Sequence, residues 1–218
     1  GSLPPIGATP AAEPTEGGFS VSWQPPYGGR AILLSVFNFF QTFGYYGFAA
    51  WVPTLLIAKG ITITHSLEYA FIIAIANPIG PLLCTAVADR MERKWQICLA
   101  AVGIGVFGLA FAFQTSPGLL IVFGVLVTLS NNWLSYAFHG YQAELFPTRI
   151  RSRAIGFVYS WSRLSAAFSG LAVAFFLNVG GVVAVFGFIA AAMLIVIVSI
   201  GAFGPRTTGR TLEAISNA

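Results

Sequence analysis

The sequence predicts an all-α membrane protein with six transmembrane helices, and two observations support this prediction. Hydrophobic residues make up 56% of the 218 residues and charged residues only 8%, whereas soluble domains carry about 25% charged residues. The apolar residues are gathered in six runs of about 20 residues or more, the length that crosses a bilayer. Because so few charges cannot cover a water-facing surface, lipid must face most of the chain.

The apolar runs comprise, in order, residues 31–58, 66–88, 95–113, 119–143, 154–177 and 182–204. Helices are the secondary structure that fits them, because backbone groups in lipid must be paired within one segment or within a closed barrel. Barrel strands would be about 10 residues long and would alternate in polarity, which these runs do not. The runs are separated by polar breaks at 59–65, 89–94, 114–118, 144–153 and 178–181.

The basic residues predict the orientation of the chain. Only Lys59 falls on one side of a six-span arrangement. The other side carries Arg30, Arg90, Arg93, Lys94, Arg149, Arg151, Arg153, Arg206 and Arg210. Cytoplasmic loops carry the excess of Lys and Arg, so both termini are expected in the cytoplasm. Residues 1–29, rich in Pro and Gly, are expected to form a flexible cytoplasmic segment, 30–204 the transmembrane domain and 205–218 a cytoplasmic tail.

The loop 144–153 reads ELFPTRIRSR and combines an acid, a proline that ends a helix, and three arginines. One interpretation is an ion-pair latch between helix ends, in which Glu144 meets an arginine such as Arg151. The alternative is a basic anchor at the membrane surface that has no specific partner. The spacing alone favours neither.

Three stretches together resemble the major facilitator superfamily of transporters. The loop with Glu144, Pro147 and Arg151 resembles the family's Glu-x-x-Pro-x-x-x-Arg loop between its tenth and eleventh helices. The turn that begins with Asp89, Arg90 and Met91 resembles the Asp-Arg-x-Gly-Arg-Arg signature between the eighth and ninth. The resemblance implies that the six spans form the C-terminal half of a twelve-helix transporter.

The match to the family's signatures is incomplete. Glu92 and Thr85 stand where the family has glycine, and Arg93 follows Glu92 as in the signature. The tail GPRTTGRTLE at 204–213 resembles the Pro-Glu-Thr-x-Gly-x-x-Leu-Glu segment of sugar porters, with Arg206 in place of the glutamate. In this family the paired loops are expected to latch and release during transport, which assigns a gating role to Asp89, Arg90, Arg93, Glu144 and Arg151.

A comparison with sugar porters places few of their sugar-binding groups in this chain. Gln41 keeps one glutamine of the seventh helix, and Asn77 keeps the asparagine of the eighth. Tyr46 replaces an asparagine of the seventh helix, and His139 replaces the tryptophan of the tenth. In the eleventh helix, Arg163 occupies the position of the tryptophan in the family's asparagine–tryptophan pair. The resemblance therefore argues against a hexose substrate.

Arg163 is the principal candidate for substrate binding. It lies ten residues after Arg153, about 15 Å along a helix, which places it near the middle of a hydrocarbon core about 30 Å thick. A charge there is costly and should face a cavity or a partner, and the planar guanidinium suits carboxylates. Organic-ion transporters, which this segment also resembles, have Arg at this position when they carry anions. The alternative is a structural ion pair with another part of the transporter.

Several polar residues could share this site. Tyr159 lies one turn from Arg163, and Asn132, Tyr136 and His139 lie on one face of the fourth span. They would line the pathway or make hydrogen bonds between helices. His139 could relay protons or simply pack.

The sequence thus predicts a secondary transporter for a small organic anion, a carboxylate metabolite, coupled to protons and working by alternating access. It is expected in a cell membrane, a bacterial inner membrane, beside a second six-helix half. The rivals are a sugar porter of altered selectivity and a membrane receptor or scaffold. We found no constellation for an enzyme, a cofactor, a metal ion or nucleic acid.

Overall fold

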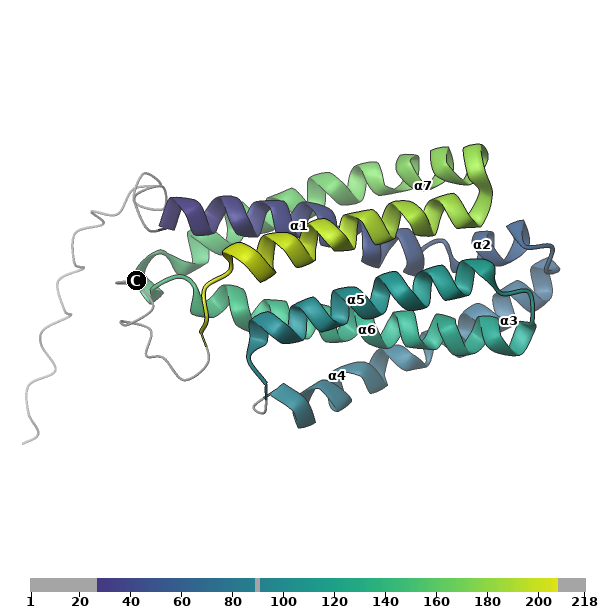
Figure 1. Ribbon diagram of the computed structural model, residues 1–218, viewed down its shortest axis with the longest axis horizontal. Coiled ribbons are helices and arrows are strands. Elements are labelled where there is room, and N and C mark those ends of the chain that lie inside the picture. The colour runs from purple at the N-terminus through teal and green to yellow at the C-terminus, as the bar shows by residue number, and fades with distance from the viewer. Residues whose placement is uncertain (1–26, 89–90, 208–218) are drawn as a thin grey trace, which may run out of the picture.

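The computed structural model describes residues 27–88 and 91–207. In this part every regular element is a helix, and the helices form one elongated bundle (Figure 1). Three helices in it are long and apolar enough to cross a membrane, at Arg93–Phe113, Pro117–Glu144 and Ile150–Phe203. The last of these contains two spans, and two further spans are each divided into two helices. The fold confirms the predicted class, an all-α membrane protein with six spans.

The first span is divided into α1 (Tyr27–Ala49) and α2 (Val52–Ala58). Pro53 lies in the first turn of α2. A proline has no N–H, so it cannot pair with the carbonyl four residues earlier, which belongs to Ala49. The helix therefore ends at Ala49 and starts again where proline is tolerated.

The second span is divided into α3 (Ile63–Ala74) and α4 (Ala76–Ala88). Here Pro78 removes the helical donor for the carbonyl of Ala74. The side chain of Asn77 replaces it, because its Nδ2 donates to that carbonyl over 3.1 Å. The amide thus satisfies a carbonyl that the proline leaves without its helical donor.

The other spans are α5 (Arg93–Phe113), α6 (Pro117–Glu144) and α7 (Thr148–Val198), which ends in a short π-helical turn, η2 (Ser199–Phe203). The helix α7 reverses direction at Gly180 and Gly181, so that it forms both the fifth and the sixth span. Gly181 has φ +65° and ψ −159°, a conformation open essentially only to glycine. The turn lies where the sequence predicted it, within 178–181.

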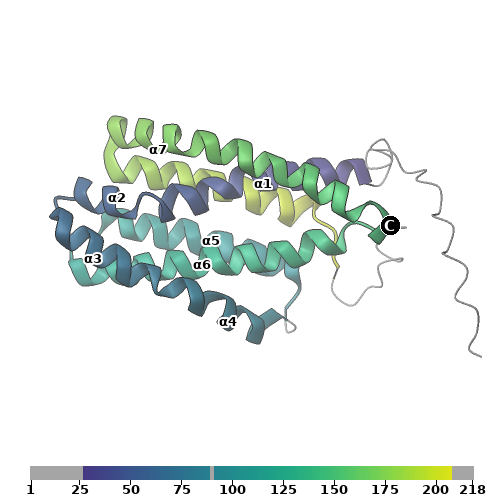
Figure 2. The same cartoon turned by 180° about the vertical axis from the view of Figure 1, so that it is seen from behind.

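The spans exchange partners across the bundle. The first span packs against the fifth and sixth, and the fourth packs against the second and third (Figure 2). Ser165 of α7 donates to the carbonyl of Phe39 over 2.6 Å, and Phe43 meets Phe188 of the sixth span edge-on at 5.0 Å. This exchange fits two interleaved repeats of three helices, the arrangement known from transporter halves.

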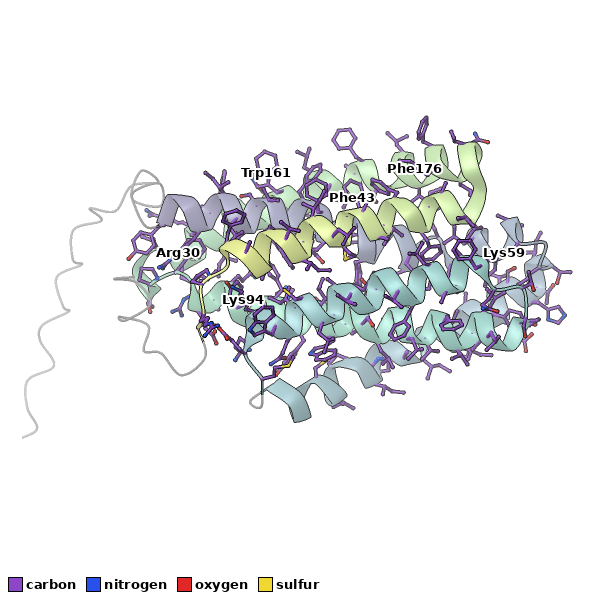
Figure 3. All side chains as sticks on the ribbon, viewed as in Figure 1. Arg30, Phe43, Lys59, Lys94, Trp161 and Phe176 are labelled. Carbon is purple, nitrogen blue, oxygen red and sulfur yellow. The ribbon has the colours of Figure 1, made fainter. Side chains whose placement is uncertain are left out.

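A lysine closes the bundle at each end (Figure 3). Nζ of Lys59 lies 2.7 Å from the carbonyl oxygens of Ala112 and Gln114, at the C-terminus of α5. Nζ of Lys94, at the opposite end, lies 2.8 Å from the carbonyl oxygen of Gly204, just after η2. Cations at helix C-termini donate hydrogen bonds to the free carbonyls and interact favourably with the negative end of the helix dipole. We call these the Lys59 end and the basic end; the latter also carries Arg30 and Arg93.

Candidate functional site

An ion pair joins the start of α5 to the end of α6 at the basic end. Nε of Arg93 lies 2.7 Å from Oε1 of Glu144, and both side chains are about three-quarters buried. Gly140, one turn before Glu144, makes room for this pair. A Cβ atom at Gly140 would collide with the Arg93 guanidinium.

The sequence predicted that Glu144 and Arg151 pair with each other or with neighbouring helix ends, and the structure pairs Glu144 with Arg93, at the start of the neighbouring helix α5. Nε of Arg151 donates to the carbonyl of Phe146 over 3.2 Å, so that it caps the end of α6. The turn of the chain at Pro147 directs Arg151 back onto its own loop, whereas Arg93 arrives from a neighbouring helix. Asp89 and Arg90, also predicted as gating residues, lie outside the described residues.

The segment 204–207 crosses the basic end as a strap. Its backbone accepts hydrogen bonds at Gly204 from Lys94 and at Pro205 from the Tyr141 hydroxyl, the latter over 2.9 Å. Nε of Arg206 lies 3.8 Å from Oε2 of Glu92. Both Arg206 and Glu92 depart from the signatures that the chain resembles, and the structure brings the two departures together with opposite charges.

Arg163 and Tyr159, predicted to share a site, are in contact. Nη2 of Arg163 donates to the Tyr159 hydroxyl over 3.0 Å, and its Cζ lies 5.0 Å from the ring centroid. The Tyr159 ring in turn lies 6.4 Å from the ring of His139 on α6. Within the described residues, no carboxylate oxygen lies within 4.0 Å of an Arg163 nitrogen. The guanidinium is exposed on this half of the fold.

The polar stripe of α6 faces a groove of about 400 Å³ beside α4. Asn132, Tyr136 and His139 line it, as the sequence predicted for one shared face, together with Pro81 and Arg93. Asn132 Nδ2 donates to Asn77 Oδ1 over 3.2 Å. The structure thus joins the two predicted asparagines across α4 and α6, and Arg93, which pairs with Glu144, also lines the groove.

The two candidates on α1 stand apart from these contacts. Gln41 is half-buried, and its Nε2 lies 3.4 Å from the hydroxyl of Thr42. Tyr46 is exposed and meets Tyr45 edge-on, with ring centroids 5.2 Å apart. Neither residue lines the groove of α6.

Sequence reasoning missed a second cavity, of about 180 Å³, where the breaks of the first two spans face α6. Asn131 lines it and is 4% exposed. The available signal was the presence of proline in two successive spans, at Pro53 and Pro78, because broken membrane helices often surround binding sites. In the part of the chain described, no group of three or more His, Cys, Asp and Glu side chains could hold a metal ion.

Comparison with known proteins identifies the family. The model of the Major Facilitator Superfamily matches residues 34–215. The chain is 34% identical, over 83% of its length, to a putative metabolite transport protein, YyaJ, of Bacillus subtilis. It is 31% identical over 69% to the cis,cis-muconate transport protein of Acinetobacter baylyi, and 25% identical over 94% to a niacin transporter of the same species. The chain spans 37–47% of the length of these relatives.

The fold agrees with this assignment. The chain superposes on the proton:xylose symporter XylE with a TM-score of 0.67 and 19% identity, covering 86% of this chain and 42% of that one. These matches are to transporters and not to enzymes. A multi-pass bundle of apolar helices with this fold, matched by the family model over most of its length, belongs to the Major Facilitator Superfamily.

Proposed function

We propose that this chain forms one half of a secondary transporter that carries a small organic anion by alternating access, coupled to protons. The observation that carries the proposal is Arg163, which lies far from the basic end of its helix and has no carboxylate partner among the described residues. A guanidinium inside the membrane costs at least about 2.5 kcal/mol unless a cavity or an anion receives it.

Tyr159 prepares Arg163 for this task. The hydroxyl accepts from Nη2 and the ring lies under the guanidinium, which orients the side chain and leaves its other nitrogens free to donate to a ligand. A carboxylate would accept two parallel hydrogen bonds from this fork. The relatives add support, because niacin and cis,cis-muconate, the compounds in the names of two of them, are carboxylates at neutral pH.

The half would act with a second six-helix half, since a substrate site at the centre of such transporters lies between two halves. The acid that carries the proton is expected in that second half, because the acids of the described residues lie near the ends of the bundle, Glu92 and Glu144 at the basic end and the exposed Glu68 in the first turns of α3. The excess of basic residues supports a cytoplasmic location for the basic end. The Arg93–Glu144 pair would then be part of the latch that holds one state.

Binding of benzoate and of xylose to the purified chain in detergent tests the substrate class. We expect benzoate to bind and xylose not to bind. Arg163→Ala should weaken benzoate binding about 100-fold, and Arg163→Lys should weaken it less, because Lys keeps the charge but loses the fork. Arg206→Gln, which removes a charge at the basic end, is the matched control. Unchanged benzoate binding by a folded Arg163→Ala would contradict the proposal.

Uptake into proteoliposomes, with and without a proton gradient, tests the mechanism. Xylose uptake would favour a sugar porter, and anion binding without uptake would favour a receptor or a need for the second half. Adding the second half then separates these last two.

A further inference from the structure

His139 stands beside the Arg163–Tyr159 pair on a neighbouring helix. Its ring lies 6.4 Å from the ring of Tyr159, and Cζ of Arg163 lies 5.0 Å from the centroid of the same ring. These two distances keep the guanidinium carbon and the imidazole centre at most about 11 Å apart. His139 is exposed and lines the groove beside α4. One tyrosine thus separates a permanent cation from a group that can become one.

A hydrogen bond fixes the tautomer of the neutral imidazole. Nδ1 of His139 lies 2.6 Å from the carbonyl oxygen of Ser135, one turn earlier in α6. A carbonyl oxygen can only accept, so Nδ1 carries the proton and Nε2 holds the lone pair. In the part of the chain described, the hydrogen bonds of this ring are made by Nδ1. No carboxylate oxygen of these residues lies within 4.0 Å of either ring nitrogen.

The charged and titratable groups around the imidazole come from three helices. Tyr136 of α6 and Arg93 of α5 line the same groove, and Arg93 is paired with Glu144. From α7 come Tyr159 and, in contact with it, Arg163. The helix α4, on the other side of the groove, contains no acidic or basic residue. Because Glu144 is committed to Arg93, a charge on the imidazole would have to be met by a ligand.

We propose that protonation of His139 on Nε2 creates a second anion-binding group beside Arg163, so that the site takes a dicarboxylate together with one proton. The inference rests on the proposed function, because Arg163 holds the first carboxylate. Nε2 takes a proton from water and donates it in a charge-assisted hydrogen bond to the second carboxylate, while Nδ1 keeps its bond to Ser135. This proton is bound in addition to any that the acid expected in the second half carries.

Binding of the proton and binding of the dicarboxylate should strengthen each other. A carboxylate beside Nε2 favours the charged imidazole, and the charged imidazole favours the carboxylate by the same factor. Histidine ordinarily changes charge between about pH 5 and 8. The contact is therefore present at the acid end of this range and is lost as the pH rises. A monocarboxylate held by Arg163 alone lacks it, so the ratio of the two affinities isolates His139.

Equilibrium binding to the purified chain in detergent tests the proposal at about pH 6 and about pH 8.5. The ligands are benzoate, isophthalate and terephthalate, whose carboxyl groups are ionised at both values. At about pH 6 the better dicarboxylate should bind about fivefold to tenfold more tightly than benzoate, the contribution of one hydrogen bond. At about pH 8.5 it should lose this advantage. Its binding should also take up protons from a weakly buffered solution, whereas benzoate binding should not.

Substitutions of the two histidines assign the effect. His139→Gln should remove the preference for the dicarboxylate at about pH 6, and His139→Arg should keep it at both pH values. His65→Gln, which changes the chain's other histidine at the Lys59 end, is the matched control and should keep the preference and its pH dependence. A preference that persists in folded His139→Gln, or that is equal at both pH values in the wild-type chain, would overturn the inference. If His139→Gln does not fold, His139→Arg and the wild-type pH dependence still test it.

The outcomes separate this inference from the proposed function. Arg163→Ala should weaken benzoate and both dicarboxylates, and it tests the proposed function. If benzoate binds through Arg163 but neither dicarboxylate gains at acid pH, the inference fails and the proposed function stands. If benzoate binding does not depend on Arg163 while acid pH favours a dicarboxylate through His139, the proposed function fails and the second anion-binding group stands. Absence of anion binding at both pH values would contradict both.

Discussion

Arg93 and Glu144 form an ion pair of 2.7 Å that ties the start of α5 to the end of α6. The two side chains are mostly buried, so solvent screens their attraction less than it screens a surface pair. Oε2 of Glu144 is buried without a hydrogen-bond partner, which leaves an acceptor for another donor in the latch proposed above. The pair can therefore both stabilise this half and take part in a change of state.

Glu144→Gln tests the pair directly. It removes the charge but keeps the shape, and we expect it to lower the free energy of unfolding by about 1 kcal/mol. In a reconstituted transporter it should slow turnover more than it weakens substrate binding. Glu68→Gln is the control, since Glu68 pairs with His65 on an exposed surface. Wild-type stability and turnover in Glu144→Gln would leave the loop as a basic anchor only.

Gly140→Ala should reproduce the effect of Glu144→Gln without touching either charge. The added Cβ would occupy the place of the Arg93 guanidinium, so the pair must separate or α5 must shift. Combining the two substitutions should cost little more than either one alone. Gly156→Ala, where nothing lies within 4 Å of the added atom, should instead stabilise the helix by up to about 1 kcal/mol. Additive losses would show that Gly140 acts independently of the pair.

The sequence predicted the spans well because their signals are local. Apolar runs, the turn at 178–181 and the prolines act through their immediate neighbours, and the structure places helices and reversals accordingly. The contact of Arg163 with Tyr159 was predictable for the same reason, since residues four apart on a helix are neighbours.

The partners of charged groups were less predictable because they lie far apart in the sequence. Glu92 and Arg206 each stood out as a departure from a known pattern, but only the folded chain shows that they lie 3.8 Å apart. The partner of Glu144 depended on the direction of the chain after Pro147. Asn131 gave no signal either, because its unpaired oxygen is a property of the surrounding helices.

Exchanging the charges of Glu92 and Arg206 tests whether their ion pair holds the strap 204–207 in place. Glu92→Arg or Arg206→Glu alone should place like charges together and lower the melting temperature slightly. The double variant should restore it. Because Arg206 is 70% exposed, the coupling should be a few tenths of a kcal/mol, and it should fade at high salt. A double variant no better than the sum of the single ones would show that the Lys94 and Tyr141 bonds alone hold the strap.

Cysteine labelling tests the orientation. The native cysteines, Cys84 and Cys98, are buried, so labelling in intact cells should report mainly an introduced cysteine. Thr64→Cys, exposed in the first turn of α3 near the Lys59 end, should react with an impermeant reagent from outside. Thr148→Cys, at the basic end, should react only after the membrane is opened. The reverse pattern would invert the assignment from the basic residues.

Asn77 has two roles that one pair of substitutions separates. Its Nδ2 fills the place of the backbone donor that Pro78 lacks, and its Oδ1 accepts from Asn132. Asn77→Ala should therefore cost about 1–2 kcal/mol in the wild-type chain, the sum expected of two hydrogen bonds. In a Pro78→Ala chain the backbone N–H returns to the carbonyl of Ala74, so the same substitution should cost about half as much. Denaturant unfolding of the four chains in detergent measures this difference. An equal cost in both backgrounds would show that the amide does not substitute for the missing backbone donor, and that the break in the second span is held by packing instead.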